Sequence, residues 1–376
     1  DTIMPNVLKN LVVGGVVGGM ATAIAFAQRG IVVDLVDIDP HWKVLGAGIT
    51  ITGPTLRAFK ALDLLDEVSA VAAFSKKIGL YTQAGDLIAE HEMPPLAADL
   101  PAAGGILRPA LHKIMSSRTT ALGTNVQLGV TVKSFTQDAD GVDVTFTDGS
   151  EGRYDLVVGA DGAFSAIRSM LFPDAPRPQF TGQGCWRVLA DRPEWLDSGR
   201  MYYGPDRKAG VTPCSADKMY MFCNSTMPGN PRIDDAEGIE MLRELLAGFG
   251  GVIATVRDEL GPDSAFNYRP LEAMLLPRPW ALNRVGLIGD AAHATTPHLA
   301  SGAGLAVEDG LVLAQEMLAA DSVAAGWQAF EERRWERGRL VVETSVKLGQ
   351  MEIDRAPSED QTRVFGAAVA ALAEPI

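Results

Sequence analysis

Hydrophobic and polar positions change their spacing along the chain, and the first block predicts a strand, a helix and a second strand in succession. Residues 8–13 form a short apolar run, residues 18–29 carry small and apolar side chains, and Gly30 is a typical residue just beyond a helix. Residues 31–36 are rich in β-branched side chains and lead into Asp37. Such a unit implies two parallel strands joined by a right-handed crossover.

Residues 125–152 instead alternate between apolar and polar positions. Asp-Gly pairs at 140–141 and 148–149 predict tight hairpin turns. The apolar run at 154–158 predicts a buried strand, and a Gly-containing loop follows it.

The region from 176 to 280 carries many prolines and glycines between short apolar stretches. Residues 185–189 and 218–222 read as strands, and residues 235–248 read as a helix. We therefore predict a second region that is rich in β-sheet.

The buried-strand pattern returns at residues 284–293, and the remaining chain reads as helical. Helices are predicted from about residue 304 to 319, from 324 to about 353, and from 367 to 373. Strands followed by Gly-rich loops and helices thus recur near residues 14, 160 and 290, which predicts an α/β fold with a discontinuous nucleotide-binding domain. The predicted parts are residues 1–70, 100–175 and 281–325 for this Rossmann-like domain, 71–99 and 176–280 for an inserted β-rich substrate domain, and 326–376 for a C-terminal helical segment.

The composition of the chain disfavours several classes of binding partner and metal site. The chain has 376 residues, and 33 Lys and Arg stand against 47 Asp and Glu, for a net charge of −14. This charge disfavours nucleic acid and anionic membrane surfaces as partners. Three cysteines without paired spacing favour a reducing, cytoplasmic compartment, and the five histidines show no metal-type spacing.

The uncharged stretch at residues 11–27 imitates a targeting peptide. Lys9 precedes it, and Ala25-Phe26-Ala27 resembles a cleavage site. Four glycines interrupt the run, a strand of the same unit follows, and a membrane span needs about 20 apolar residues. We therefore assign the stretch to the first strand–loop–helix element.

That element carries an incomplete dinucleotide-binding fingerprint. In G-x-G-x-x-G the glycines allow a tight turn, close approach to a pyrophosphate, and helix–strand packing. Gly14 and Gly19 take the first and third places, Val16 takes the second, and Asp37 follows at the strand end where a ribose-binding acid is expected. We expect Val16 to cause a clash, a loop shift or a strained backbone. A glycine-rich turn without a cofactor is the alternative interpretation.

Two further loops have the same design. In "GADGAFSAIR", Asp161 lies in the turn, Ser165 is a candidate helix N-cap, and Arg168 follows one turn later. In "VGLIGDAAHATTPHLASGAGLAVED", Asp290 ends a strand and is placed to accept hydrogen bonds from a sugar-type hydroxyl. The backbone N–H groups of residues 302–304, at a helix N-terminus, suit an anion or developing negative charge.

Together the three segments resemble the class A flavoprotein monooxygenases, the p-hydroxybenzoate hydroxylase-like family that includes salicylate hydroxylase-type enzymes. The resemblance covers nearly the whole chain and extends to residues 46–68 and to Arg108 in "RPALHKIM". It implies FAD as the cofactor and NAD(P)H as the reductant. The residues implied to hold these cofactors are Gly14, Gly15, Val16, Val17, Gly19, Asp37, Gly48, Ile49, Arg108, Asp161, Asp290, Pro297, Gly302, Ala303 and Gly304.

The resemblance also implies a reaction, in which a flavin C4a-hydroperoxide formed from O₂ hydroxylates a small aromatic or heteroaromatic substrate. Pro297, His298, Gly302 and Gly304 are the candidates nearest this chemistry. His298 is either an acid or base beside the flavin or a solvated loop histidine, and the second interpretation is favoured. Substrate contacts are expected around Trp186, Arg187 and 219–222, where Trp186 and Tyr220 are more typical of a core.

Alternatives to this enzyme remain open. Val16 allows a flavin-poor family member that acts as a binding protein. A flavin-dependent halogenase would carry W-x-W-x-I-P, and none of the six tryptophans forms that pattern. The predicted partners are a small aromatic substrate and O₂, and the sequence leaves a homodimer open.

Overall fold

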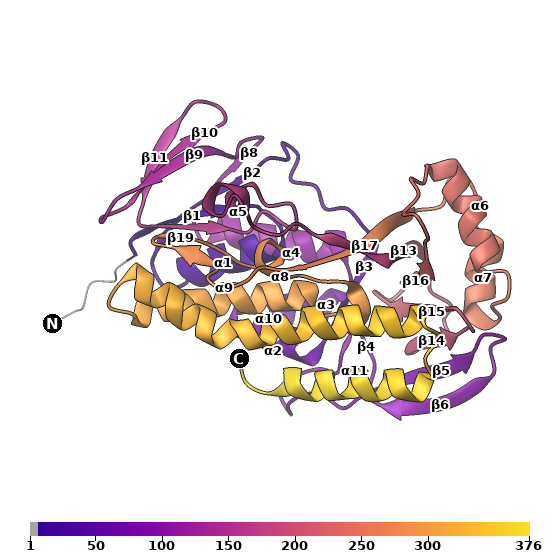
Figure 1. The fold of residues 1–376 in the computed structure, drawn as a ribbon. Coiled ribbons are helices and arrows are strands. Elements are labelled where there is room, and N and C mark those ends of the chain that lie inside the picture. Colours follow the sequence, from indigo (N-terminus) through magenta and orange to yellow (C-terminus); the bar gives the residue numbers. More distant parts are fainter. Residues whose placement is uncertain (1–6) are drawn as a thin grey trace.

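The computed structural model describes residues 7–376, so the first six residues of the predicted nucleotide-binding domain lie outside it. A six-stranded sheet, ordered β18-β19-β12-β1-β2-β8, forms one layer of the molecule (Figure 1). All neighbouring strands pair in parallel except β18 with β19. The strands are β1 (Lys9–Val13), β2 (Val32–Asp37), β8 (Asn125–Leu128), β12 (Leu156–Gly159), β18 (Ala281–Leu282) and β19 (Val285–Leu287).

This sheet confirms the predicted Rossmann-like α/β fold. β1, β12 and β19 lie far apart in the sequence but side by side in the sheet, and each ends at one of the three Gly-containing loops. Loops that follow neighbouring parallel strands meet at one edge of a sheet, where ligands of open α/β folds bind.

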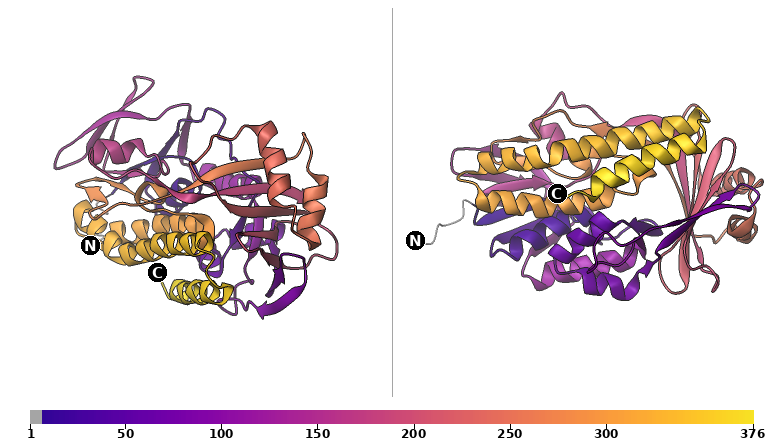
Figure 2. Two further views of the ribbon diagram at one scale, coloured as in Figure 1. Left: turned by 45° about the vertical axis from the view of Figure 1, so that its right-hand side comes forward. Right: turned by 90° about the horizontal axis from the view of Figure 1, so that it is seen from below.

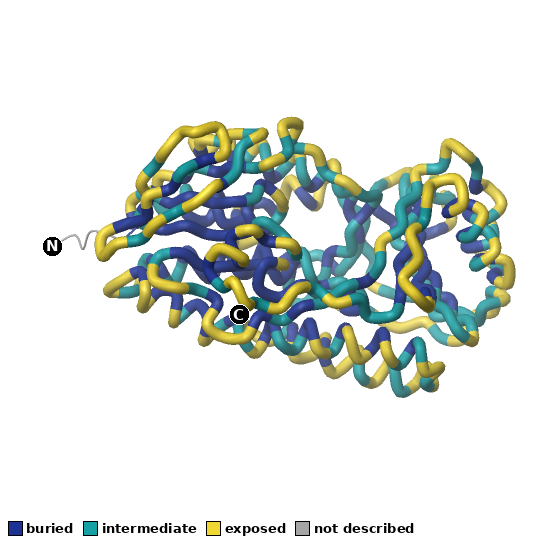
Figure 3. The backbone as a smooth tube through the Cα atoms, turned by 45° about the horizontal axis from the view of Figure 1, so that its top comes forward, coloured by how far each residue is buried: buried dark blue, intermediate teal, exposed yellow. Residues whose placement is uncertain are grey.

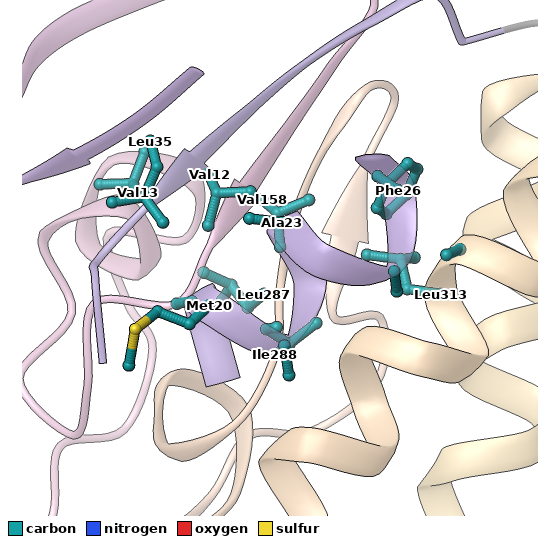
Figure 4. Close-up of a cluster of buried hydrophobic side chains, with 14 of the residues drawn as sticks. Val12, Val13, Met20, Ala23, Phe26, Leu35, Val158, Leu287, Ile288 and Leu313 are labelled. Carbon is teal, nitrogen blue, oxygen red and sulfur yellow. The ribbon is translucent and has the colours of Figure 1, made fainter. Parts of the chain in front are cut away.

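Two buried helices, α1 (Val17–Ala27) and α9 (Gly302–Ala319), pack together beside this sheet. Gly310 permits a close approach, since a Cβ there would lie 2.7 Å from the Thr22 backbone nitrogen. Figure 4 shows the apolar cluster around α1, where Ala23 lies toward Val12 and Val158, Met20 lies toward Leu287, and Phe26 lies beside Leu313 of α9. The apolar stretch at residues 11–27 is therefore the central core of this layer.

Two small sheets flank the six strands. The hairpins predicted in residues 125–152 are confirmed by an antiparallel sheet of β9 (Val132–Gln137), β10 (Val142–Phe146) and β11 (Glu151–Tyr154), although β8 joins the parallel sheet instead. The other small sheet contains β3 (Gly48–Ile51), β7 (Gly104–Leu107) and β4 (Ala73–Phe74). The neighbouring helices are α2 (Gly53–Ala61), α3 (Leu65–Val71) and α4 (Arg108–Ala121), while α5 (Ala166–Leu171) follows β12.

A seven-stranded, mostly antiparallel sheet forms the second large layer, ordered β17-β13-β16-β15-β14-β5-β6. One face is covered by α6 (Asp235–Leu245) and α7 (Gly251–Glu259), with a separate core between them. The stretches predicted at 185–189 and 218–222 are the middles of two longer strands. The strands are β5 (Lys77–Thr82), β6 (Leu87–Glu92), β13 (Gln179–Asp191), β14 (Gly199–Tyr203), β15 (Arg207–Pro213), β16 (Lys218–Thr226) and β17 (Phe266–Leu275).

The C-terminal helices connect the two layers. The 31-residue helix α10 (Val323–Ile353) packs on α9 at one end and reaches β13 and β17 at the other (Figures 1 and 2). Helix α11 (Ser358–Ala373) folds back beside it. Figure 3 shows buried backbone concentrated within each layer and exposed backbone at the periphery. The short helices α8 (Asp290–His293) and η1 (Pro297–Leu299) lie between β19 and α9.

Candidate active site

The first Gly-containing turn requires its glycines. Gly14 has φ +107°, and a Cβ there would lie 2.2 Å from the carbonyl oxygen of Ala160. A Cβ on Gly19 would lie 1.8 Å from the Gly14 carbonyl oxygen. Helix α1, which follows, has no side-chain cap at its N-terminus. Its first N–H groups therefore form a donor set suited to a phosphate group.

Two side chains hold this turn, Asp37 at the end of β2 and Trp42 in the loop that follows. The Gly15 N–H donates to Asp37 Oδ2 at 2.6 Å, and the Trp42 indole N–H donates to the Gly15 carbonyl oxygen at 2.7 Å. Trp42 has φ +49° and meets His112 edge to face, with ring centroids 5.5 Å apart. Asp37 was predicted from its place at the strand end, whereas Trp42 was not, because no motif marks an indole that bonds to a loop carbonyl.

The backbone strain expected at Val16 is wrong. Val16 has φ −89° and ψ −171°, which is extended backbone that valine adopts readily, and α1 begins at the next residue. The side chain is 52% exposed, so much of its surface lies in solvent. The prediction that stays at this position is that its methyl groups compete with a bound pyrophosphate.

The second Gly-containing loop is bonded within itself. Asp161 accepts hydrogen bonds from the Ser165 hydroxyl and from the Ile167 N–H, and Ser165 caps α5 by accepting from the Arg168 N–H at 2.9 Å, as predicted. Burial raises the pKa of Asp161, although these donors oppose the shift. The buried Arg168 guanidinium donates to the Ala163 and Ala291 carbonyl oxygens, which ties α5 to α8.

The third loop is organised by a fully buried carboxylate that was not among the predicted site residues. Asp309 accepts from the Gly289 N–H at 2.9 Å, lies 2.5 Å from His293 Nε2, and accepts from Arg334 Nε at 2.7 Å. Burial alone would raise the pKa of Asp309, but His293 and Arg334 lower it to about 2. An acidic residue in an apolar helical stretch was the available signal. Through Gly289, Asp309 fixes the start of α8.

Asp290 is the first residue of α8, and its carboxyl lies close enough to Arg108 for their charges to interact. Its side chain is solvent-exposed, yet the protein packed around the carboxyl raises its pKa. Nearby His293 and Arg108 oppose that shift. A carboxylate that solvent can reach, but that protein atoms surround on several sides, is an effective acceptor for hydroxyl groups of a ligand.

Arg108 begins α4 and approaches Asp290 from another element. Its Nε donates to the Gly48 carbonyl oxygen at 3.3 Å, and a Cβ on Gly46 would lie 2.7 Å from the Arg108 side chain. Burial lowers the pKa of Arg108, and the charge of Arg187 lowers it further. Within residues 7–376 neither guanidinium lies within 4 Å of a carboxylate oxygen. Two cations that are close enough to repel each other and lack a carboxylate partner favour an anionic occupant.

A small apolar recess lies between the N-termini of α1 and α9. It brings together four of the predicted cofactor residues, Val17, Ile49, Ala303 and Gly304. Gly304 must stay small, because a Cβ there would lie 2.0 Å from Thr55 Oγ1. Helix α9 also has no side-chain cap, so the N–H groups of its first turn are available to a ligand.

The favoured interpretation of His298 as a solvated loop histidine is wrong. His298 is buried at 8% exposure, its Nδ1 lies 2.8 Å from Thr296 Oγ1, and its Nε2 lies 3.0 Å from Gln183 Oε1. Pro297 precedes it in η1, and Ala300 with φ +50° turns the chain into α9. The imidazole therefore bonds to the second layer, and Pro297 and Gly302 lie on either side of this anchor.

The seven-stranded sheet presents two different faces. Trp186, Met219 and Met221 belong to the core under α6 and α7, as expected for Trp186. Because side chains alternate along a strand, Arg187 and Tyr220 lie on the opposite face. Tyr220 is buried, and its hydroxyl lies 2.5 Å from Thr50 Oγ1 on β3. This polar face is turned toward the loops described above.

Two further observations concern residues 7–376 only. No group of three or more His, Cys, Asp or Glu side chains is arranged to hold a metal ion. No helix combines the length and apolar character needed to span a bilayer. The arrangement does fit FAD, since a phosphate cradle that a Cβ would fill and a second uncapped helix N-terminus lie on either side of one apolar recess.

Comparison with known proteins identifies the class. Residues 8–345 match the family model described as "FAD binding domain". The chain therefore belongs to this family, the FAD-binding class A flavoprotein monooxygenases. It is similar to the aurachin C monooxygenase/isomerase of Stigmatella aurantiaca, with 30% identity over 92% of this chain and 89% of the relative. It is also similar to the FAD-dependent urate hydroxylase of Klebsiella pneumoniae, with 27% identity over 89% and 88%.

The fold has solved counterparts. The structure of Klebsiella pneumoniae HpxO complexed with FAD and uric acid superposes with a TM-score of 0.87 at 24% identity, covering 98% of this chain and 97% of that one. At this level of identity the likeness supports the two-layer fold alone. The predicted family and fold class are confirmed, whereas the roles of individual site residues stay predictions.

Proposed function

We propose that the protein is an NAD(P)H-dependent hydroxylase of a small aromatic or heteroaromatic compound. The observation that carries this proposal is the shared space between two uncapped helix N-termini, Asp290, and the polar face of the seven-stranded sheet. Urate, which is named for one relative, is a small heteroaromatic compound of this kind.

FAD, when bound and reduced by NAD(P)H, supplies the chemistry of oxygen activation. The α1 turn would bind its pyrophosphate through backbone N–H groups, and Asp37 would accept from a ribose hydroxyl. Asp290 would accept from the ribityl chain. The first N–H groups of α9, at Gly302 and Ala303, would stabilise negative charge on the ring system. Asp161 is proposed to serve both FAD and NAD(P)H.

The substrate would lie against the polar face of the sheet. Arg187 would orient an ionised or polar substituent, because its guanidinium has no carboxylate partner within 4 Å in the described chain. Tyr220 lies beside it toward β3, where its bond to Thr50 connects the sheet to the FAD side. The apolar recess and the packed layers would keep water away from the reacting atoms.

The test is a substrate screen on purified protein with added FAD. Oxidation of NADH and of NADPH is followed with phenolic and nitrogen-heteroaromatic compounds, and products are examined by mass for one added oxygen atom. We expect stimulated oxidation with at least one compound, and Arg187→Gln is expected to raise its KM more than it lowers kcat. A yellow protein that forms no oxygenated product across the screen contradicts the proposal. A colourless protein that FAD does not reconstitute supports the binding-protein alternative.

A further inference from the structure

Four polar side chains from four elements meet behind the loop at residues 297–301, three of them buried and Lys208 partly buried. His298 lies in η1, Gln183 in β13, Lys208 in β15 and Glu352 in the last turn of α10. Gln183 Nε2 donates to Glu352 Oε2 at 2.8 Å, and Lys208 Nζ lies 3.0 Å from Glu352 Oε1. His298 Nε2 completes the group, 3.0 Å from Gln183 Oε1 and 3.4 Å from Glu352 Oε2.

The acceptor-only carboxylate of Glu352 fixes which atoms of Gln183 and His298 donate and which accept. The Glu352 carboxylate only accepts, so Gln183 must present its amide N–H to Glu352 and its Oε1 to His298. His298 Nε2 must then carry a proton and donate it. The packing is equally specific, because a Cβ on Gly349 of α10 would lie 2.9 Å from Gln183 Oε1 and 3.1 Å from His298 Cε1. The group therefore forms a single bonded chain from α10 to η1.

The negative charge of Glu352 is paired with the positive charge of Lys208, and both side chains are largely shielded from solvent. Burial alone would raise the pKa of Glu352, but Lys208 and His298 hold it well below its ordinary value. The exposed fractions of the Glu352 and Lys208 side chains are 6% and 18%. A buried ion pair adds little net stability, since the loss of hydration offsets the attraction. Its contribution here is a fixed geometry.

We propose that Gln183, Lys208 and Glu352 are positioning residues that hold the loop at residues 297–301 through His298. Two of them belong to the sheet that carries the proposed substrate face, and the loop leads directly into the N-terminus of α9. The layer that receives the substrate thereby sets the position of the N–H groups that face the flavin ring. This inference rests on the proposed function for the location of the flavin.

The test replaces the ion pair by apolar side chains in the double variant Lys208→Met/Glu352→Leu. This exchange leaves no unpaired buried charge, so the fold is expected to persist. The two-electron midpoint potential of bound FAD is measured against a reference dye. Displacement of the α9 N-terminus should weaken the preference for reduced flavin roughly tenfold, which lowers the potential by about 30 mV.

The matched control is Arg278→Met/Glu331→Leu, which removes another ion pair of α10, where Arg278 Nε lies 2.6 Å from Glu331 Oε1. We expect an unchanged flavin potential in the control. Hydrogen exchange of the amides at residues 298–304 gives a second readout that needs no flavin, and it should accelerate only in the Lys208/Glu352 variant. Wild-type potential and wild-type exchange in that variant would overturn the proposal, whatever its melting temperature. If the potential shifts in the Lys208/Glu352 variant but the wild type oxygenates no tested compound, the positioning role is supported and the proposed function is contradicted.

Discussion

The two helix N-termini that face the candidate site are held in opposite ways. The turn before α1 is bonded within its own layer, by Asp37 and Trp42 and by the Gly14 N–H, which donates to the Val36 carbonyl oxygen at 2.8 Å. The loop before α9 is bonded to the other layer through His298. The proposed phosphate end of the site thus depends on contacts within one layer, whereas the proposed flavin end depends on correct assembly of both layers.

The largest expected effect tests the local end. Gly19→Ala would place a Cβ 1.8 Å from the Gly14 carbonyl oxygen, so α1 must move away from the turn. We expect a loss of about 3 kcal/mol in the free energy of unfolding and loss of FAD retention on gel filtration. Gly366→Ala in α11 is the control, because a Cβ there meets nothing within 4 Å. A Gly19→Ala protein that stays yellow and keeps the wild-type melting temperature would show that the turn before α1 does not depend on this glycine.

The next effect tests the buried carboxylate behind the flavin end. The pKa of Asp309 is about 2 in the folded protein, below its ordinary 3.8. Because the folded value is the lower one, the stabilisation is complete above pH ~4 and is lost as the pH falls toward 2. Its size is about 2 kcal/mol at neutral pH. Asp309→Asn should flatten this part of the acid unfolding curve, and Asp360→Asn on exposed α11 should leave it unchanged. The same acid slope in Asp309→Asn and the wild type would show that this carboxylate does not contribute.

A smaller effect tests the hydrogen bond that Trp42 donates to the turn before α1. Trp42→Phe removes the indole N–H that donates to Gly15 but keeps an aromatic ring. We expect the free energy of unfolding, measured by thermal unfolding, to fall by about 1 kcal/mol and FAD to bind several-fold more weakly. Trp195→Phe is the matched control, since Trp195 is 57% exposed. Equal FAD affinities in the two variants would mean that the turn keeps its shape without the indole.

The smallest effect addresses Val16. Replacement by glycine should tighten FAD binding a few-fold, because it removes methyl groups from the phosphate cradle. It should also cost up to about 1 kcal/mol of stability, since glycine gains freedom in the unfolded chain. Fluorescence titration with FAD and thermal unfolding measure the two effects separately. FAD affinity equal to that of the wild type would show that Val16 does not crowd the pyrophosphate.

The same contrast explains what the sequence could reveal. Gly14, Gly19 and Asp37 act through backbone geometry and short-range bonds, so their spacing alone predicted the turn. His298 was misjudged because its partners, Gln183 and Glu352, lie 115 and 54 residues away. The sheet order places β14 beside β5 across more than a hundred residues, and local sequence patterns do not encode so remote a pairing.

The strand order of the parallel sheet has a consequence for biosynthesis. β12 lies between β1 and β19, and its residues Leu156, Val157 and Val158 are fully buried. On the ribosome, β19 appears about 125 residues after β12, a delay of roughly 6 to 25 s at ordinary rates of elongation. Throughout that interval an apolar strand edge is open to other chains. The edge of β12 stays unpaired until β19, which follows the last strand of the seven-stranded sheet, has been synthesised.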